Sequence, residues 1–190
     1  TLLVNDRDAL EAIFEGTGGL IAVNAEDEQR MIERLDDIKG RTDIAAHAEW
    51  RDDVTALLAT QLAVELAQEF GHRLHVLHLT SGIEADWLED ITTLPSLSGE
   101  NGAIITTETL PQHLTFDETD VAREGTRLQM NPPIRYAKDR ETLWKQLKKG
   151  TIQCIATDHA PHTLEAKGLG FPNAPSGMPG VETSLAVMLT

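Results

Sequence analysis

The stretch Ile152-Gln-Cys-Ile-Ala-Thr-Asp158-His159-Ala-Pro161-His162 decides how the rest of the chain is interpreted. It begins as a short apolar run with β-branched residues and ends in an acid and two histidines. A continuous apolar run of this length is typical of a strand buried on both faces of a parallel sheet. Folds of this type place their chemistry at the carboxyl ends of the strands. Two interpretations are open: a catalytic strand end, or a polar turn in which Asp158 caps a neighbouring segment.

Three further apolar runs, at 20–23, 74–79 and 103–106, have the form of buried strands. Between them the apolar spacing predicts helices, the longest from Asp52 to Phe70. A helix over 138–149 has its acids first and its lysines last, and Gly150 ends it. Residues 44–51 and 163–180 show no helical pattern and are predicted to be irregular, whereas 181–189 begins another helix. Strands that alternate with helices predict an α/β fold in which helices cover a parallel sheet.

The number of strands is too small for a complete barrel. Eight strands and their helices need about 250 residues, whereas this chain has 190, begins at Thr1 without a methionine and stops at Thr190 within a helical pattern. An open sheet is the alternative. The positions of the two chain ends favour a partial barrel, of which only the middle and C-terminal part is present. We therefore expect a single domain over 1–190 that is truncated at both ends.

Composition excludes several classes of function. The sequence has 31 acidic and 16 basic residues, a formal charge of −15, and 41% hydrophobic residues. Nucleic acids and anionic membranes require a basic face, so neither is expected as a partner. The single cysteine, Cys154, allows no intrachain disulfide and indicates a reducing compartment. Because no apolar run approaches the length of a membrane span, a cytoplasmic location is expected.

Polar side chains follow each predicted strand, and in a barrel they would converge on one mouth. They are Asn24, Glu26 and Asp27 after the first, His78 and Thr80 after the second, Thr107 and Glu108 after the third, and Asp158, His159 and His162 after the last. Histidines and carboxylates that converge suggest a divalent metal that polarises a carbonyl and activates water. For His78 the competing interpretation is a core histidine bonded to the backbone. Strand alternation places His75 on the opposite face from His78, so only His78 suits a ligand.

Three motifs together resemble the dihydroorotase family of cyclic amidohydrolases, which are metal-dependent (β/α)8 TIM barrels. They are Thr157-Asp-His-Ala-Pro-His162, Asn131-Pro-Pro-Ile-Arg135 and the segment from Asn173 to Thr183. The resemblance extends over essentially the whole chain. It implies the reversible cyclisation of N-carbamoyl-L-aspartate to dihydroorotate in pyrimidine biosynthesis. The implied chemistry uses a metal-activated hydroxide and an aspartate general base, with one or two zinc ions per complete subunit.

The resemblance also implies individual roles. Asp158 would be the catalytic general base and a ligand of the first metal, and His78 would be a ligand of the second. Asn131 would contact the pyrimidine ring. His162 and the backbone at Ala174 would engage the carboxylate of the substrate.

The sequence departs from the family at the metal ligands. Asn24 stands where the family has a histidine ligand of the second metal, and a neutral amide is a poor ligand for zinc. The family's His-x-His pair and its bridging lysine or aspartate would lie upstream of Thr1. His47 is not an obvious replacement for the missing histidine. Gln112 stands where the family often has histidine and where hydantoinases often have glutamine.

These departures leave two alternatives to an active dihydroorotase. One is a catalytically inactive dihydroorotase-like structural partner, for example of aspartate transcarbamoylase. The other is a different cyclic amidohydrolase, such as a hydantoinase or an allantoinase. A homo-oligomer is compatible with each of these functions. We expect the isolated 190-residue chain to be inactive, because it lacks the His-x-His pair.

Overall fold

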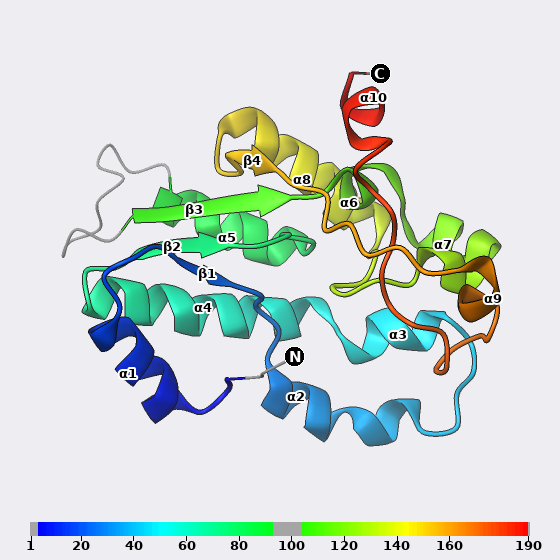
Figure 1. The fold of residues 1–190 in the computed structure, drawn as a ribbon, viewed down its shortest axis with the longest axis horizontal. Helices are drawn as coiled ribbons and strands as arrows, with labels where there is room; N and C mark the ends of the chain where they lie inside the picture. The colour runs from blue at the N-terminus through cyan, green and yellow to red at the C-terminus, as the bar shows by residue number, and fades with distance from the viewer. Residues whose placement is uncertain (1–3, 93–103, 190) are drawn as a thin grey trace.

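The computed structural model describes residues 4–92 and 104–189, whose strands form one parallel sheet (Figure 1). The strands are β1 (Ile21–Val23), β2 (Arg73–Val76), β3 (Ile104–Thr109) and β4 (Cys154–Ile155), in the order β1-β2-β3-β4. Each strand runs parallel to its neighbour, with Leu74 opposite Ile21 and Ile105. The predicted α/β architecture is therefore confirmed. Ala103, the first residue of the predicted third strand, lies outside the described residues.

Helices connect the strands. They are α1 (Arg7–Gly16), α2 (Glu28–Glu33), α3 (Ala45–Trp50), α4 (Asp53–Glu69), α5 (Gly82–Thr92), α6 (Pro111–Thr115), α7 (Glu118–Glu124), α8 (Ala137–Lys149), α9 (Leu164–Lys167) and α10 (Ser184–Met188), with short 3-10 helices η1 (Leu35–Ile38) and η2 (Gly125–Leu128). The predicted limits of α4 hold because Asp52 accepts a hydrogen bond from the Thr55 amide at 2.9 Å. Gly150, in the left-handed region at φ 86°, ends α8 as predicted. None of the described helices has the length and apolar character needed to cross a membrane.

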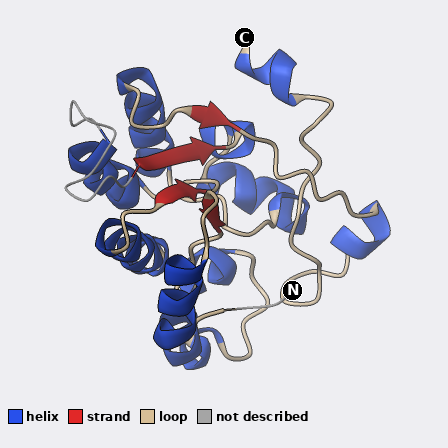
Figure 2. Cartoon of the chain, turned by 60° about the vertical axis from the view of Figure 1, so that its left-hand side comes forward, coloured by secondary structure: helices blue, strands red, loops and turns tan. Residues whose placement is uncertain are grey.

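The hydrophobic core lies between the sheet and α4, α5 and α8. Leu74 and Val76 of β2 are fully buried there, together with Leu66, Leu88 and Leu143 of the three helices. Figure 2 shows these helices along one side of the strands. Because side chains alternate along a strand, the residue between Leu74 and Val76 faces away from this core. The other face of the sheet is thus left for polar side chains.

The prediction that the last strand is buried on both faces is wrong. Only Cys154 and Ile155 pair with β3, and both are exposed. The reason is position, because β4 is the last strand in the order and no described strand pairs with its outer edge. Ile152, two residues earlier, is buried in the main core. The apolar run therefore consists of one buried residue, Ile152, followed by the exposed edge strand β4.

Two segments predicted to be irregular contain short helices. Residues 44–51 include α3, in which Ala46 and His47 are buried, and 163–180 include α9. Asp43 and Thr163 start them, since their side chains accept from the amides of Ala46 and Ala166. Helices this short complete fewer than two turns, so no apolar period can be recognised in their sequence.

A carboxyl group is buried between α4 and α5. Glu84 is 2% exposed and accepts a hydrogen bond from the hydroxyl of Thr60. Burial raises the pKa of Glu84 to about 7, because desolvation penalises the charged form. The folded chain therefore carries an ionised carboxylate in its core at alkaline pH.

Replacing this group should stabilise the chain at alkaline pH. Since the pKa of Glu84 is raised from 4.5 to about 7 on folding, its contribution to stability is fully present below pH 4.5 and is lost as the pH rises through 7. Glu84→Gln keeps an acceptor for Thr60 and removes the titration. We expect a gain of up to about 3 kcal/mol in the free energy of unfolding near pH 8, falling toward zero near pH 5.

Urea unfolding at the two pH values measures this difference. Glu65→Gln is the matched control, because its side chain is 58% exposed, and it should change stability little at either pH. A Glu84→Gln variant that is destabilised equally at both pH values would contradict the prediction.

Candidate active site

The carboxyl ends of the strands are tied together by backbone hydrogen bonds at one edge of the sheet. The Leu77 amide donates to Val23 at 3.1 Å, the Leu79 amide to Glu108 at 2.7 Å, and the Ala156 amide to Thr109 at 3.0 Å. The predicted convergence of the segments that follow the strands is therefore real for β1, β2, β3 and β4.

His78 sits where the backbone reverses the direction of its hydrogen bonds. In a regular strand, amides two residues apart point to the same neighbouring strand. Here the Leu77 amide points to β1, whereas the Leu79 amide points to the end of β3. The reversal occurs at His78, whose φ of 38° lies in the left-handed region. Bulge-like irregularities of this kind re-aim side chains at the ends of strands.

Asp158 has the same unusual conformation, with φ at 42°. Within residues 4–92 and 104–189, His78 and Asp158 are the non-glycine residues with positive φ. This conformation costs about 1–3 kcal/mol and gathers at functional sites, where the surrounding structure enforces it. The backbone thus singles out the two residues that the resemblance predicts as metal ligands.

The charges of three acidic side chains act on His78. The imidazole is 5% exposed, and burial lowers its pKa, against the charges of Asp158, Glu26 and Glu108, which act to raise it. His78 is therefore close enough to all three carboxylates to feel their charges. It is not an isolated core histidine.

His75, predicted to lie on the opposite face from His78, also has a carboxylate partner. His75 lies on the face of β2 away from the core, where its Nε2 is 3.1 Å from Glu108 Oε2 and its Nδ1 is 2.7 Å from Thr106 Oγ1. Since Glu108 also influences His78, both histidines lie near one carboxylate. Strict alternation ends at Val76, before the backbone reversal.

The described residues do not by themselves complete a metal site. In the ranges 4–92 and 104–189, no three His, Cys, Asp or Glu side chains are placed to hold one ion. Asn24, exposed after β1, offers only a neutral amide. Glu108, predicted to follow the third strand, lies within β3 instead and is engaged by His75. Of the predicted ligands, Asp158 lies close enough to His78 for its charge to act on the imidazole.

Asn131 is held by a histidine that sequence reasoning set aside. The Nε2 of His47 lies 3.0 Å from Asn131 Oδ1, across 84 residues of sequence. Burial, and then the charge of Arg51, lowers the pKa of His47 to about 4, so the ring is neutral at pH 7 and donates from Nε2. His47 is no substitute ligand for Asn24. It orients the amide that is predicted to contact the ring of the substrate.

His162 and Ala174 lie on two segments in close contact. His162 is exposed, and its Nε2 is 3.1 Å from the Ser176 carbonyl. Gly177 has a φ of 140°, and a Cβ there would lie 2.6 Å from the Ala160 carbonyl, so only glycine fits. The Ala174 amide donates to Gly170 and its carbonyl accepts from Gln129, both at 2.8 Å. Neither backbone group of Ala174 is free in this arrangement.

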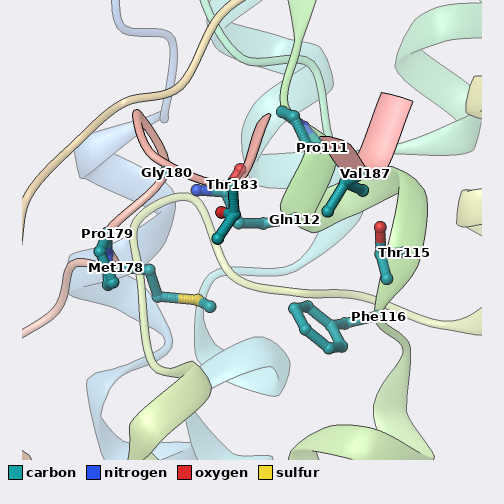
Figure 3. Close-up of a pocket in the computed structure, with 9 residues that line it drawn as sticks. All are labelled: Pro111, Gln112, Thr115, Phe116, Met178, Pro179, Gly180, Thr183 and Val187. Atoms are coloured by element: carbon teal, nitrogen blue, oxygen red, sulfur yellow. The ribbon is translucent and has the colours of Figure 1, made fainter. Parts of the chain in front are cut away.

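Gln112 holds the backbone next to Asp158. Its Nε2 donates to the carbonyl of Thr157 at 3.1 Å, which fixes the residue directly before Asp158. Beside it lies an apolar cavity of about 250 Å³ between α6 and α10, shown in Figure 3. Its lining residues are Pro111, Gln112, Thr115, Phe116, Met178, Pro179, Gly180, Thr183 and Val187. The Gln112 position therefore has a structural role.

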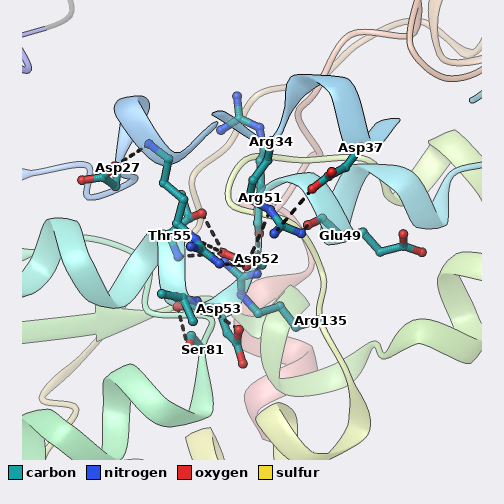
Figure 4. Close-up of polar contacts among 12 residues, drawn as sticks. Asp27, Arg34, Asp37, Glu49, Arg51, Asp52, Asp53, Thr55, Ser81 and Arg135 are labelled. Atoms are coloured by element: carbon teal, nitrogen blue, oxygen red, sulfur yellow. Dashed lines mark hydrogen bonds and ion pairs between the residues drawn. The ribbon is translucent and has the colours of Figure 1, made fainter. Parts of the chain in front are cut away.

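A polar network joins the end of α3 to the loops of the site (Figure 4). Arg135, 4% exposed, donates from Nη1 to the Arg51 carbonyl at 2.6 Å and from Nε to Thr80 Oγ1 at 2.9 Å. Asp52 accepts from both Arg30 and the first turn of α4. These bonds fix the segment after Asn131 against the one after His78.

The parallel sheet, with acid and imidazole side chains at its strand ends, matches part of the barrel of solved amidohydrolase structures. No protein-family model matched the chain. The solved structure of L-hydantoinase (dihydropyrimidinase) from Arthrobacter aurescens superposes with a TM-score of 0.87 at 31% identity, covering 97% of this chain and 41% of that one. The chain itself belongs to the dihydroorotase family.

Two curated relatives carry this assignment. The dihydroorotase of Lactococcus lactis subsp. lactis (strain IL1403) is 43% identical over 125 residues, which are 66% of this chain and 28% of the relative. That of Methanosarcina mazei is 33% identical over 190 residues, 99% of this chain and 41% of the relative. The chain thus spans between 28% and 41% of the length of these relatives.

The strain at Asp158 can be measured with a matched pair of variants. Asp158→Gly and Asp158→Ala both remove the carboxylate, but only glycine adopts positive φ without steric cost. We expect Asp158→Gly to be more stable than Asp158→Ala by about 1 kcal/mol in urea unfolding. The same pair at Asp86, inside α5, should show the opposite order, because glycine weakens a helix. Equal stabilities at position 158 would show that its conformation is not strained.

Proposed function

We propose that this chain carries part of the active site of a dihydroorotase, which interconverts dihydroorotate and N-carbamoyl-L-aspartate. The observation that supports this most is the shared positive φ of His78 and Asp158 at one edge of the sheet. The predicted substrate residues Asn131 and His162 follow in the adjoining loops. We further propose that residues 1–190 form one partial barrel domain.

Each of the predicted catalytic and substrate-binding residues has a chemical role in this proposal. Asp158 is the general base, which accepts a proton from the attacking water and passes it to the ring nitrogen that leaves. Asn131, oriented by His47, hydrogen-bonds the pyrimidine ring. His162 anchors the carboxylate of the substrate, and Ala174 joins it once its backbone groups exchange their present partners.

Amidohydrolases use metal ions, and we propose zinc for the complete protein. His78 and Asp158 are suitable donors, but in the described part of the chain no three His, Cys, Asp or Glu side chains are arranged to hold one ion. Asn24 argues for one metal rather than two, because its amide replaces an imidazole. The 190-residue chain also contains no His-x-His pair.

Two other functions have specific support. A hydantoinase is favoured by Gln112 and by the 31% identity to the L-hydantoinase structure. A non-catalytic partner, for instance of aspartate transcarbamoylase, is favoured by Asn24. A cytoplasmic location and self-association are compatible with all three functions.

The full-length protein separates these functions in one assay series. We expect hydrolysis of dihydroorotate, with a loss of about 100-fold or more in kcat for Asp158→Asn, since general base catalysis contributes that much. Asp86→Asn, on the exposed face of α5, is the control and should leave kcat unchanged. Hydrolysis of hydantoin but not of dihydroorotate would assign a hydantoinase. A folded protein inactive on both substrates would overturn catalysis and favour the partner.

Metal content tests the assignment of Asn24. Asn24→His should raise the zinc bound per subunit of the full-length protein, because imidazole replaces an amide. Asn24→Gln, which restores no imidazole, should leave it unchanged. The isolated 190-residue chain should not hydrolyse dihydroorotate with added zinc. Turnover by that chain would show that its own residues complete the site.

A further inference from the structure

Lys167 is a buried cation whose partners are all backbone carbonyls. The side chain ends α9 and is 5% exposed. Its Nζ donates to the carbonyls of Gln129 at 2.7 Å, of Pro175 at 3.0 Å and of Gly177 at 3.0 Å. An ammonium has three N–H donors, so this arrangement uses all of them. Buried charges are normally paired with an opposite charge, and here dipoles of peptide groups take that role.

The three carbonyls come from two segments that carry the proposed substrate residues. Gln129 precedes Asn131 by two residues, and Pro175 and Gly177 flank Ser176, whose carbonyl is 3.1 Å from His162 Nε2. The Gln129 carbonyl also accepts from the Gly177 amide at 2.9 Å. The Gln129 side chain donates from Nε2 to the carbonyl of Ala174 and to the hydroxyl of Ser176. The ammonium thus lies where the two segments cross.

We propose that Lys167 is the positioning residue of this site: its ammonium serves as a built-in monovalent cation that holds the Asn131 segment and the 174–178 segment in one arrangement. Rings of backbone carbonyls bind small monovalent cations in the same way. Burial lowers the pKa of Lys167 to about 8, so the ammonium keeps its proton at pH 7. Only the effect on turnover rests on the proposed function.

Removing the ammonium should weaken the contact between the Asn131 segment and the 174–178 segment. It should also leave the three carbonyls free to bind a small cation. In Lys167→Met, hydrogen exchange of the Gly177 amide should be about tenfold faster or more, since bonds to a charged donor are lost. The amides of β2, which report global opening, should not change. Ammonium chloride should slow the Gly177 exchange again, whereas tetramethylammonium chloride at equal ionic strength should not, because it has no N–H donor.

Lys39→Met is the matched control, since the Lys39 side chain is 82% exposed. In this variant the hydrogen-exchange rate of the Gly177 amide should equal that of the wild type. An unchanged Gly177 exchange in Lys167→Met would overturn the proposal. Equal slowing by the two salts would overturn it as well, because ionic strength alone would then explain the effect.

A second variant covers the outcome in which Lys167→Met does not fold. Lys167→Cys in a Cys154→Ser background can be alkylated in denaturant with 2-bromoethylamine, which restores an ammonium of the same length, or with iodoethane, which does not. The ammonium adduct should refold with wild-type protection at Gly177, and the ethyl adduct should not. Equal protection in both adducts would overturn the role of the charge.

In the full-length protein, Lys167→Met should raise the KM for dihydroorotate about tenfold or more, with a smaller change in kcat, because it displaces residues that bind substrate. Ammonium ions should lower the KM of this variant toward the wild-type value. A KM unchanged in a variant whose Gly177 exchange is faster would overturn the link to substrate binding. Exchange needs no turnover, so a wild-type protein inactive on dihydroorotate would defeat the proposed function and leave the exchange test valid.

Discussion

The backbone hydrogen bonds on either side of His78 are the constraint on which the site depends. The amide before it is committed to β1 and the amide after it to the end of β3. No regular strand satisfies both bonds, because amides two residues apart would face the same neighbour. His78 accommodates both bonds in a left-handed conformation, and the charges of Asp158 and Glu26 act on its buried ring. The parallel sheet thus enforces the local strain and gains a positioned imidazole from it.

The sequence predicts the larger elements of the fold and misses the smaller ones for one reason. α4 and α8 span 17 and 13 residues and have capping residues at their ends. The spacing of their apolar residues and their capping residues therefore predict the same limits. α3 has six residues, too few for a period to be recognised. The apolar run at β4 predicts a buried strand, because the composition of a segment does not tell which strands lie beside it. Whether a strand is central or at an edge depends on pairings that its own residues do not encode.

The candidate site divides in the same way between motif and tertiary contact. Motifs identify Asp158 and His162, which are proposed to act on a substrate directly. His47, Gln112 and Lys167 act through other residues, across 84, 45 and 38 positions of sequence. Their partners are an amide oxygen and backbone carbonyls, which every sequence contains, so no pattern predicts these contacts, even at Gln112, whose position the family resemblance marks. Supporting residues of this kind become visible only when the fold brings distant segments together.

The distribution of charge bears on which substrate the site suits. The chain carries a formal charge of −15, yet the surroundings of His47 are cationic, because Arg51, Arg135 and Lys167 each lower its pKa. Acids balance part of this positive charge, because Arg51 pairs with Glu26 and the charges of four acids act on Arg135. The ammonium of Lys167 differs, since the partners of its Nζ are backbone carbonyls. A buried cation of this kind attracts anions. Dihydroorotate and N-carbamoyl-L-aspartate carry carboxylates, whereas hydantoin does not, so the charge of Lys167 agrees with the proposed substrate better than with hydantoin.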